Sequence, residues 1–149
     1  MRSSQFRALV VVGASLLLVA CSPAADRRDI PPGTDRVIEL TMEGMRFVPN
    51  KLDVKVGETI TFVVTNPNDI PHELFIGDAA DQAAHHAAHM AVPSSGQAMV
   101  AHMGYGIYLD AHGTGMVTYH FTKAGEIMLG CHLPGHWEAG MVAMVTVEP

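Results

Sequence analysis

The sequence predicts an all-β fold, a Greek-key β-sandwich with a short helical insert. Three observations support this prediction. Several short segments alternate apolar and polar residues, which is the period of half-buried strands. Tight turns separate these segments, and one alanine-rich stretch interrupts the alternation near the middle of the chain. Short strands divided by such turns favour a sandwich or a barrel.

Two strands are predicted in the N-terminal half. Residues 52–56 and 60–64 each place an apolar side chain at every second position, and Gly57-Glu58 lies between them as a turn. The apolar positions are Leu52, Val54, Val56, Ile60, Phe62 and Val64. A further strand is expected to begin at His72, which is in phase with Leu74 and Ile76.

The C-terminal half follows the same pattern. Strands are predicted over 117–121, 127–131 and 141–147, with a turn at 123–126. Successive side chains in a strand point to opposite faces, so Cys131 shares a face with Leu129, and Met141 shares one with Val145. If the apolar faces point inward, Cys131, Met141 and the ring of His72 meet at one end of the sandwich.

Residues 78–91 predict the helical insert. The stretch is rich in alanine, has aspartates able to cap its start, and ends before Pro93. Residues 93–113 are then predicted to be a loop, which carries Met99, His102, Met103 and His112. A loop this long inside a compact domain is often functional.

The start of the chain indicates export. Arg2 and Arg7 precede an apolar run at 8–20 that is too short to span a bilayer, so residues 1–20 are predicted to be a signal peptide. Leu18-Val19-Ala20-Cys21 resembles the lipobox of bacterial lipoproteins, which predicts acylation of Cys21 and a membrane anchor facing the periplasm or cell exterior. An ordinary signal peptide that happens to contain a cysteine is the alternative. Residues 21–36 are then a lipid-anchored flexible tether, and 37–149 form the domain.

Charge and motifs exclude other classes of function. The 149-residue chain carries a net charge of -6, and loss of residues 1–20 leaves seven basic residues against fifteen acidic ones. This balance excludes nucleic acid as an expected partner. The sequence lacks a Ser-His-Asp elbow, a phosphate loop and a CxxC motif, so we do not expect an enzyme.

One short loop carries metal-binding chemistry. Cys131-x4-His136-x4-Met141 combines a thiol, an imidazole and a thioether, and Pro134-Gly135 supplies a turn. Thiolate and imidazole with a weak axial thioether suit copper that cycles between Cu(I) and Cu(II). His72, after Pro71, offers the fourth ligand. The alternative is a buried thiol, a turn histidine and a core methionine. If Cys21 is acylated, Cys131 is the only remaining thiol, and the retention of one unpaired cysteine in an exported chain favours the metal.

With these residues, the chain resembles the cupredoxin, or blue copper, family over about 37–147. The resemblance also includes Met45-Arg46-Phe47-Val48-Pro49, Gly57 and Asn66. It implies a Greek-key sandwich that holds one type 1 copper through His72, Cys131, His136 and axial Met141. Several small members have Asn after the first ligand histidine, whereas this chain has Glu73, whose backbone N–H could still donate toward the Cys131 sulfur.

The insert offers a possible secondary metal site. His85 and His89 are four residues apart, as are His86 and Met90, so each pair can share a helix face and bind copper. A solvated helix on which histidines are merely tolerated is the alternative. His132 follows Cys131 on an extended chain, so its side chain should point to the opposite face. We expect it to be exposed or to contact the ligand residues rather than the metal.

We expect a protein that carries single electrons between partners outside the cytoplasm. Redox proteins would dock on an apolar patch near His136 and Trp137, although Trp137 could equally serve local packing. The alternative is a copper-binding module for tolerance, storage or delivery, with the His- and Met-rich insert acquiring the metal.

Overall fold

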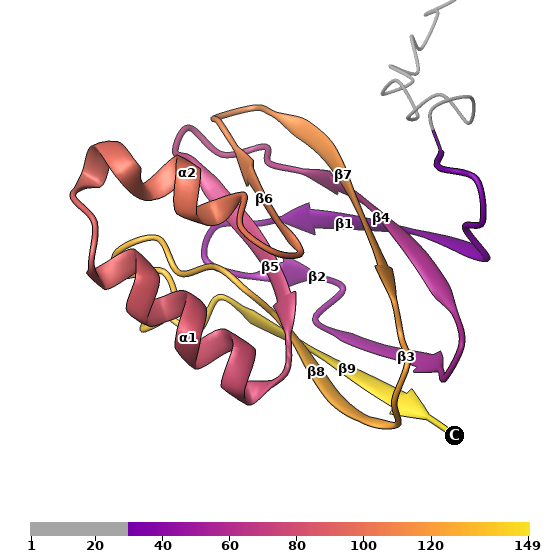
Figure 1. Cartoon of the computed structure of the whole chain (residues 1–149). Helices are drawn as coiled ribbons and strands as arrows, with labels where there is room; N and C mark the ends of the chain where they lie inside the picture. The colour runs from indigo at the N-terminus through magenta and orange to yellow at the C-terminus, as the bar shows by residue number, and fades with distance from the viewer. Residues whose placement is uncertain (1–29) are drawn as a thin grey trace, which may run out of the picture.

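Two β-sheets pack face to face in the computed structural model, which describes residues 30–149 (Figure 1). The predicted signal peptide, the acylation site at Cys21 and most of the predicted tether lie outside the described residues. Within 30–149, no helix is both long and apolar enough to cross a membrane.

The first sheet has four strands and the second has five. In spatial order, the first sheet contains β2 (Phe47–Val48), β1 (Arg36–Met42), β4 (Thr59–Thr65) and β7 (Thr114–His120). The second contains β3 (Lys51–Lys55), β9 (Val142–Glu148), β8 (Gly125–Gly130), β5 (His72–Gly77) and β6 (Gly106–Leu109). β1 runs parallel to β4, and β3 runs parallel to β9, while the other neighbours are antiparallel. The predicted β-sandwich is confirmed.

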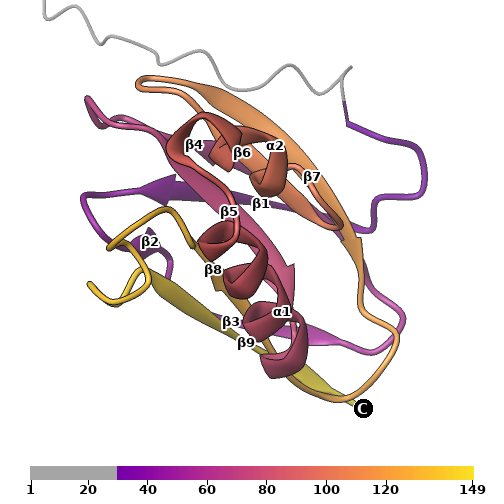
Figure 2. The ribbon, with the colours of Figure 1, turned by 60° about the vertical axis from the view of Figure 1, so that its left-hand side comes forward.

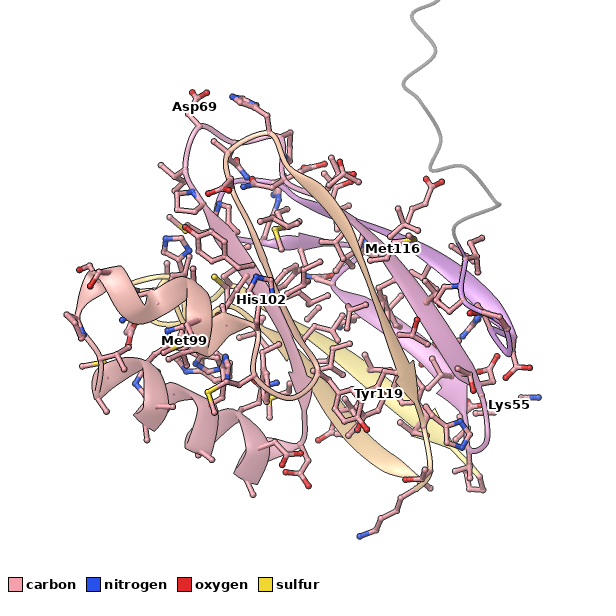
Figure 3. The ribbon with its side chains drawn as sticks, turned by 45° about the horizontal axis from the view of Figure 1, so that its top comes forward. Lys55, Asp69, Met99, His102, Met116 and Tyr119 are labelled. Atoms are coloured by element: carbon pink, nitrogen blue, oxygen red, sulfur yellow. The ribbon has the colours of Figure 1, made fainter. Side chains whose placement is uncertain are left out.

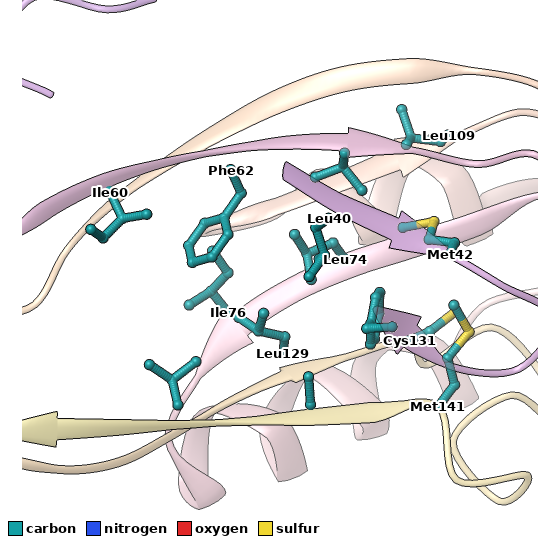
Figure 4. Close-up of a cluster of buried hydrophobic side chains, with 14 of the residues drawn as sticks. Leu40, Met42, Ile60, Phe62, Leu74, Ile76, Leu109, Leu129, Cys131 and Met141 are labelled. Atoms are coloured by element: carbon teal, nitrogen blue, oxygen red, sulfur yellow. The ribbon is translucent and has the colours of Figure 1, made fainter. Parts of the chain in front are cut away.

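The core lies between the sheets and is built from most of the strand positions that the alternation predicted, whereas Val56 follows the end of β3 and is 40% exposed. Ile60, Phe62, Val64 and Leu74 are fully buried. Burial removes the apolar side chains from water, which is the main force holding the two layers together. Figure 4 shows Cys131 and Met141 at one end of this same apolar layer, and both are fully buried.

The chain just before β1 is attached to β4. The backbone N–H of Asp35 donates to the carbonyl of Thr59 at 2.8 Å, and the Asp35 carboxylate accepts from the Thr59 N–H at 2.8 Å. The hydroxyls of Thr34 and Thr61 are also hydrogen-bonded, at 2.8 Å. These contacts fall within the 21–36 range predicted as a tether and join its last residues to the sheet.

The helical insert forms as predicted. α1 (Ala79–Met90) begins after Asp78, whose carboxylate accepts from the N–H groups of Ala80 and Asp81 in a capping box. α1 packs on the outer face of the second sheet, against β5 and β8 (Figure 2). It covers that face near the end of the sandwich that holds Cys131.

The prediction of a loop over 93–113 is wrong in part. The segment contains the short helices η2 (Ser94–Gly96) and α2 (Gln97–Ala101) and then the edge strand β6. At Gly106 a Cβ atom would lie 2.1 Å from the carbonyl oxygen of Ala101, so only glycine allows α2 and β6 to meet here. A strand of four residues is too short to show alternation, and its pairing with β5 decides its structure.

Replacing Phe62 by alanine should lower the free energy of unfolding by about 3–5 kcal/mol, because the change leaves a cavity in a fully buried position. Urea unfolding of the metal-free protein measures this loss. Val37→Ala is the control, since Val37 is 38% exposed and its truncation should cost no more than about 0.5 kcal/mol. Equal losses in the two variants would contradict the assigned core.

Candidate metal centre

His72 reaches the core end because the loop before it is hydrogen-bonded in place. The side-chain amide of the buried Asn66 donates to the carbonyls of Ile70 and Asp110, each at 2.9 Å. Its oxygen accepts from the N–H of Asn68 at 3.1 Å. Asn66 therefore joins the start of β5 to the turn between β6 and β7, and β5 enters the sandwich with the ring of His72 facing inward.

Three of the predicted ligands meet at this point. One ligand atom from each of His72, Cys131 and His136 lies within 4.8 Å of the other two. The Cys131 Sγ and His136 Nδ1 are 3.2 Å apart, and the ring centroids of His72 and His136 are 4.7 Å apart. The rings of His72 and His136 come from segments that are far apart in the sequence, and both face one sulfur.

The loop between β8 and β9 presents Cys131, His136 and Met141 together. The N–H of Cys131 donates to the carbonyl of Met141 at 3.2 Å, and the N–H of Met141 donates to the carbonyl of His136 at 3.1 Å. Gly135 and Gly140 have φ values of 85° and 87°, a conformation that side chains disfavour and that lets the loop fold back tightly. Met141 is thereby fully buried beside Cys131 (Figure 4).

Among residues 30–149, the ring nitrogens of His72 are buried polar atoms without a hydrogen-bond partner. The residue as a whole is fully buried. Buried polar atoms are nearly always paired, so an unpaired imidazole that faces a thiol and a second imidazole fits a metal ligand. Two nitrogens, one sulfur and a thioether nearby form the donor set that suits copper.

Burial sets the protonation of these ligands. Desolvation, and then the charge of His136, lower the pKa of His72 to about 4, so its ring is neutral and able to bind a metal near neutral pH. Burial raises the pKa of the Cys131 thiol to about 12. A metal ion must therefore displace the thiol proton when it binds.

Glu73 links the centre to the outer face of the sheet. Its backbone N–H donates to Cys131 Sγ at 3.4 Å, as the sequence suggested. Its carboxylate is fully buried on the opposite face, where Oε1 accepts from the His132 N–H at 2.5 Å. Burial alone would raise the pKa of Glu73, but hydrogen bonds from His85 and His89 outweigh it and bring the pKa to about 2.

His132 is buried rather than exposed, and it packs behind the ligands. It points away from Cys131, as strand parity predicts, but α1 covers that face and leaves the residue only 3% exposed. Its Nε2 lies 2.7 Å from Gln82 Oε1, and its ring stacks on Trp137 with centroids 4.3 Å apart. Burial lowers the pKa of His132 to about 4.

The remaining predicted residues divide into two groups. His85 and His89 point inward from α1 and lie beside Glu73, and the three form a second group of possible ligands. His86 instead approaches His132, with their Nδ1 atoms 3.3 Å apart, and Met90 is 72% exposed. Sequence reasoning did not single out Gln82 or Gln97, although Gln82, His85 and His89 form a polar stripe at helical spacing that could have indicated a buried polar face.

Comparison with known proteins places this geometry in a family. The family model described as "Copper binding proteins, plastocyanin/azurin family" matches residues 35–148. The "Copper-resistant cuproprotein CopI" of Pseudomonas aeruginosa is 34% identical over 139 residues, covering 76% of this chain and 77% of that protein. The protein of the same description from Rubrivivax gelatinosus is 37% identical over 115 residues, covering 76% of this chain and 67% of that protein.

Solved structures show the same fold at lower identity. Auracyanin B superimposes with a TM-score of 0.68 at 20% identity, covering 80% of this chain and 94% of that chain. Auracyanin from Roseiflexus castenholzii gives a TM-score of 0.65 at 21% identity, covering 78% of this chain and all of that chain. At these identities the likeness supports the fold.

Acid should destabilise the metal-free protein. The pKa values of His72 and His132 are about 4 in the folded chain, below the ordinary value of 6.5, so between these pH values the unfolded chain binds more protons. The contribution of these two rings to the free energy of unfolding should therefore be fully present above pH 6.5 and be lost as the pH drops toward 4. Burial lowers the pKa of His89, but its hydrogen bonds with Glu73 and Gln97 outweigh burial and raise the pKa. The stabilisation from these contacts is fully present below pH 6.5 and is lost only as the pH rises, so it does not change the trend between pH 6.5 and 4.

Urea unfolding across that range measures the loss. His72→Phe should show a shallower dependence on pH, because one of the two histidines is gone. A free energy of unfolding that is independent of pH between 6.5 and 4 would contradict the protonation states assigned to both rings.

Proposed function

The chain belongs to the plastocyanin/azurin family of copper-binding proteins, and on this premise we propose that it carries single electrons through one type 1 copper. In this proposal His72, Cys131 and His136 would hold the ion, and the Met141 thioether would be a fourth, weaker donor. The observation that carries it is the convergence of one ligand atom each from His72, Cys131 and His136 within 4.8 Å, where neither His72 ring nitrogen has a hydrogen-bond partner within residues 30–149.

The bound ion supplies one-electron chemistry between Cu(I) and Cu(II), and the protein supplies its surroundings. The ligands sit on strand ends and a hydrogen-bonded loop, so their positions change little between redox states. The Glu73 N–H points at the Cys131 sulfur and tunes its donor strength. The apolar core end excludes water, which limits the reorganisation that accompanies each electron.

Electrons would enter and leave through His136. His72, Cys131 and Met141 are fully buried, whereas His136 is only half-buried, which makes its ring the most accessible of the four proposed ligands. Trp137 is half-buried beside it, and Pro134 and Gly135 are exposed on the same loop. Redox protein partners would dock on this apolar rim. The role is electron carriage, without catalysis of its own.

Copper tolerance is the second candidate function. The relatives from Pseudomonas aeruginosa and Rubrivivax gelatinosus are described as copper-resistant cuproproteins. The insert also presents thioethers to solvent, since Met90, Met99 and Met103 are 72%, 71% and 55% exposed. Met99 and the exposed His102 lie on and just after α2 (Figure 3). Such side chains suit the capture of Cu(I) before its transfer to the buried centre.

Export and lipidation complete the proposal. The signal-like residues 1–20 and the lipobox ending at Cys21 support a chain held at a membrane surface outside the cytoplasm. This placement puts the copper centre where it meets both partners and incoming metal.

Cys131→Ser should abolish the intense visible absorption of the copper-loaded protein, because a hydroxyl is a poor copper donor and the band arises from thiolate-to-copper charge transfer. Visible spectra with metal analysis of the mature protein test this. Met141→Leu is the matched variant, since loss of the weaker thioether donor should change the reduction potential while keeping the colour. A coloured Cys131→Ser protein would refute the ligand assignment.

Stopped-flow oxidation and reduction, combined with potentiometry, separates the two functions. An electron carrier should exchange electrons rapidly and reversibly while retaining its copper in the presence of a Cu(I) acceptor. Slow electron exchange together with ready copper transfer would reject the first function. Replacing Met90, Met99 and Met103 by leucine tests the second, because unchanged loading from Cu(I) would remove the insert from copper capture.

A further inference from the structure

A second group of ligand atoms lies behind the copper centre, between α1 and β5. Glu73, His85 and His89 each contribute one ligand atom, and these atoms lie within 4.8 Å of one another. The three residues are 0%, 5% and 2% exposed. These buried groups are satisfied by one another, with His89 Nε2 2.8 Å from Glu73 Oε2, and a bound ion would replace the proton that they share.

The spacing of these atoms fits a metal ion. The two Nε2 atoms are 3.2 Å apart, His89 Nε2 lies 2.8 Å from Glu73 Oε2, and His85 Nε2 lies 3.5 Å from Glu73 Oε1. Ligands bonded at roughly 2.0–2.1 Å in a tetrahedral site stand about 3.3 Å from each other. We propose that Glu73, His85 and His89 form a second metal site, for a divalent transition-metal ion.

Gln97 sets the orientation of one of these rings. Its amide nitrogen donates to the carbonyl of His89 at 3.0 Å, which turns its oxygen toward His89 Nδ1 and fixes the proton on that nitrogen. Nε2 of His89 is therefore the nitrogen aimed into the cluster. A metal-binding histidine ordinarily donates its other N–H to an oxygen in this way, so the support for a ligand is already present.

The other ring is held by packing. His85 stacks on Phe75 with ring centroids 3.8 Å apart and planes at 5°, which aims its Nε2 at Glu73 and His89. A surface cavity of about 250 Å³, lined in part by Phe75, His85 and Met103, reaches the His85 ring, which is the most exposed member of the cluster. The cluster is thus enclosed on one side and approachable on the other.

The donor set selects the kind of ion. Two imidazole nitrogens and a carboxylate oxygen, without sulfur, suit Zn(II) or Cu(II) and disfavour Cu(I). The copper centre has the opposite character, since a thiolate and a thioether favour the softer ion. The two sites therefore bind different metal states and can be filled separately.

Glu73 couples the second site to the first. Its backbone N–H is 3.4 Å from Cys131 Sγ, while its carboxylate would bind the second ion. A dication held there adds positive charge close to the copper and should raise the reduction potential, because it disfavours Cu(II) over Cu(I). This consequence rests on the proposed type 1 copper, whereas binding of the second ion does not.

The test uses the mature protein loaded with one equivalent of Cu(II) and then titrated calorimetrically with Zn(II). Copper outcompetes zinc for the thiolate centre, so Zn(II) reports the second site. One further ion per chain should bind, and the potential of the coloured copper should rise. His85→Ala and His89→Ala should each weaken Zn(II) binding at least roughly tenfold and remove the rise in potential.

His86→Ala is the matched control on the same helix, because His86 contacts His132 and lies outside the cluster. It should bind Zn(II) like the wild type. The visible copper band shows in every variant that the domain has folded. Wild-type protein that binds no second ion, or Zn(II) binding that survives equally in His85→Ala and His89→Ala, would overturn the site. Absence of the copper band from the wild-type protein would instead count against the type 1 centre.

Discussion

The pairing of β5 with β8 is the constraint on which the rest of this structure depends. The two strands run antiparallel with Phe75 opposite Gly130 and Ile76 opposite Leu129, which brings the first residue of β5 to the end of β8. His72 and Cys131 therefore meet although they are far apart in the sequence. The adjacent hydrogen bond from the Glu73 N–H to Cys131 Sγ joins residues that are fifty-eight positions apart. β5 pairs with β8 over Phe75–Gly77 and with β6 over His72–Phe75, so sheet pairing along the strand fixes the position of His72.

Strand parity then divides the chemistry between two faces. His72 and Cys131 point into the core, and Glu73, Gly130 and His132 point outward, toward α1. A Cβ atom on Gly130 would lie 2.6 Å from Gln82 Oε1 and 2.7 Å from the ring of Trp137, so glycine allows the helix and the loop to close over this face. The helix thereby encloses a polar layer of histidines and glutamines directly behind the proposed copper ligands, and Glu73 contacts both this layer and Cys131.

Much of the fold and of the inner site could be read from local pattern. Alternation identifies β4 through Ile60, Phe62 and Val64, and Asp78 marks the start of α1 because its carboxylate caps the first turn. The spacing of Cys131, His136 and Met141 predicts three of the proposed copper ligands from local sequence, because a single loop carries all three. β6 escaped prediction because four residues carry no period and the strand exists only through its pairing with β5.

The sequence by itself determined the donor chemistry: which side chains can bind copper, which strands face them inward, and where the insert becomes helical. These properties depend on residue type and on neighbours a few positions away. Only the tertiary structure decided that His132 is buried, that Glu73 lies against His85 and His89, and that Gln97 orients one of these rings. Those contacts join segments from different parts of the chain, and their existence depends on where α1 packs against the sheet.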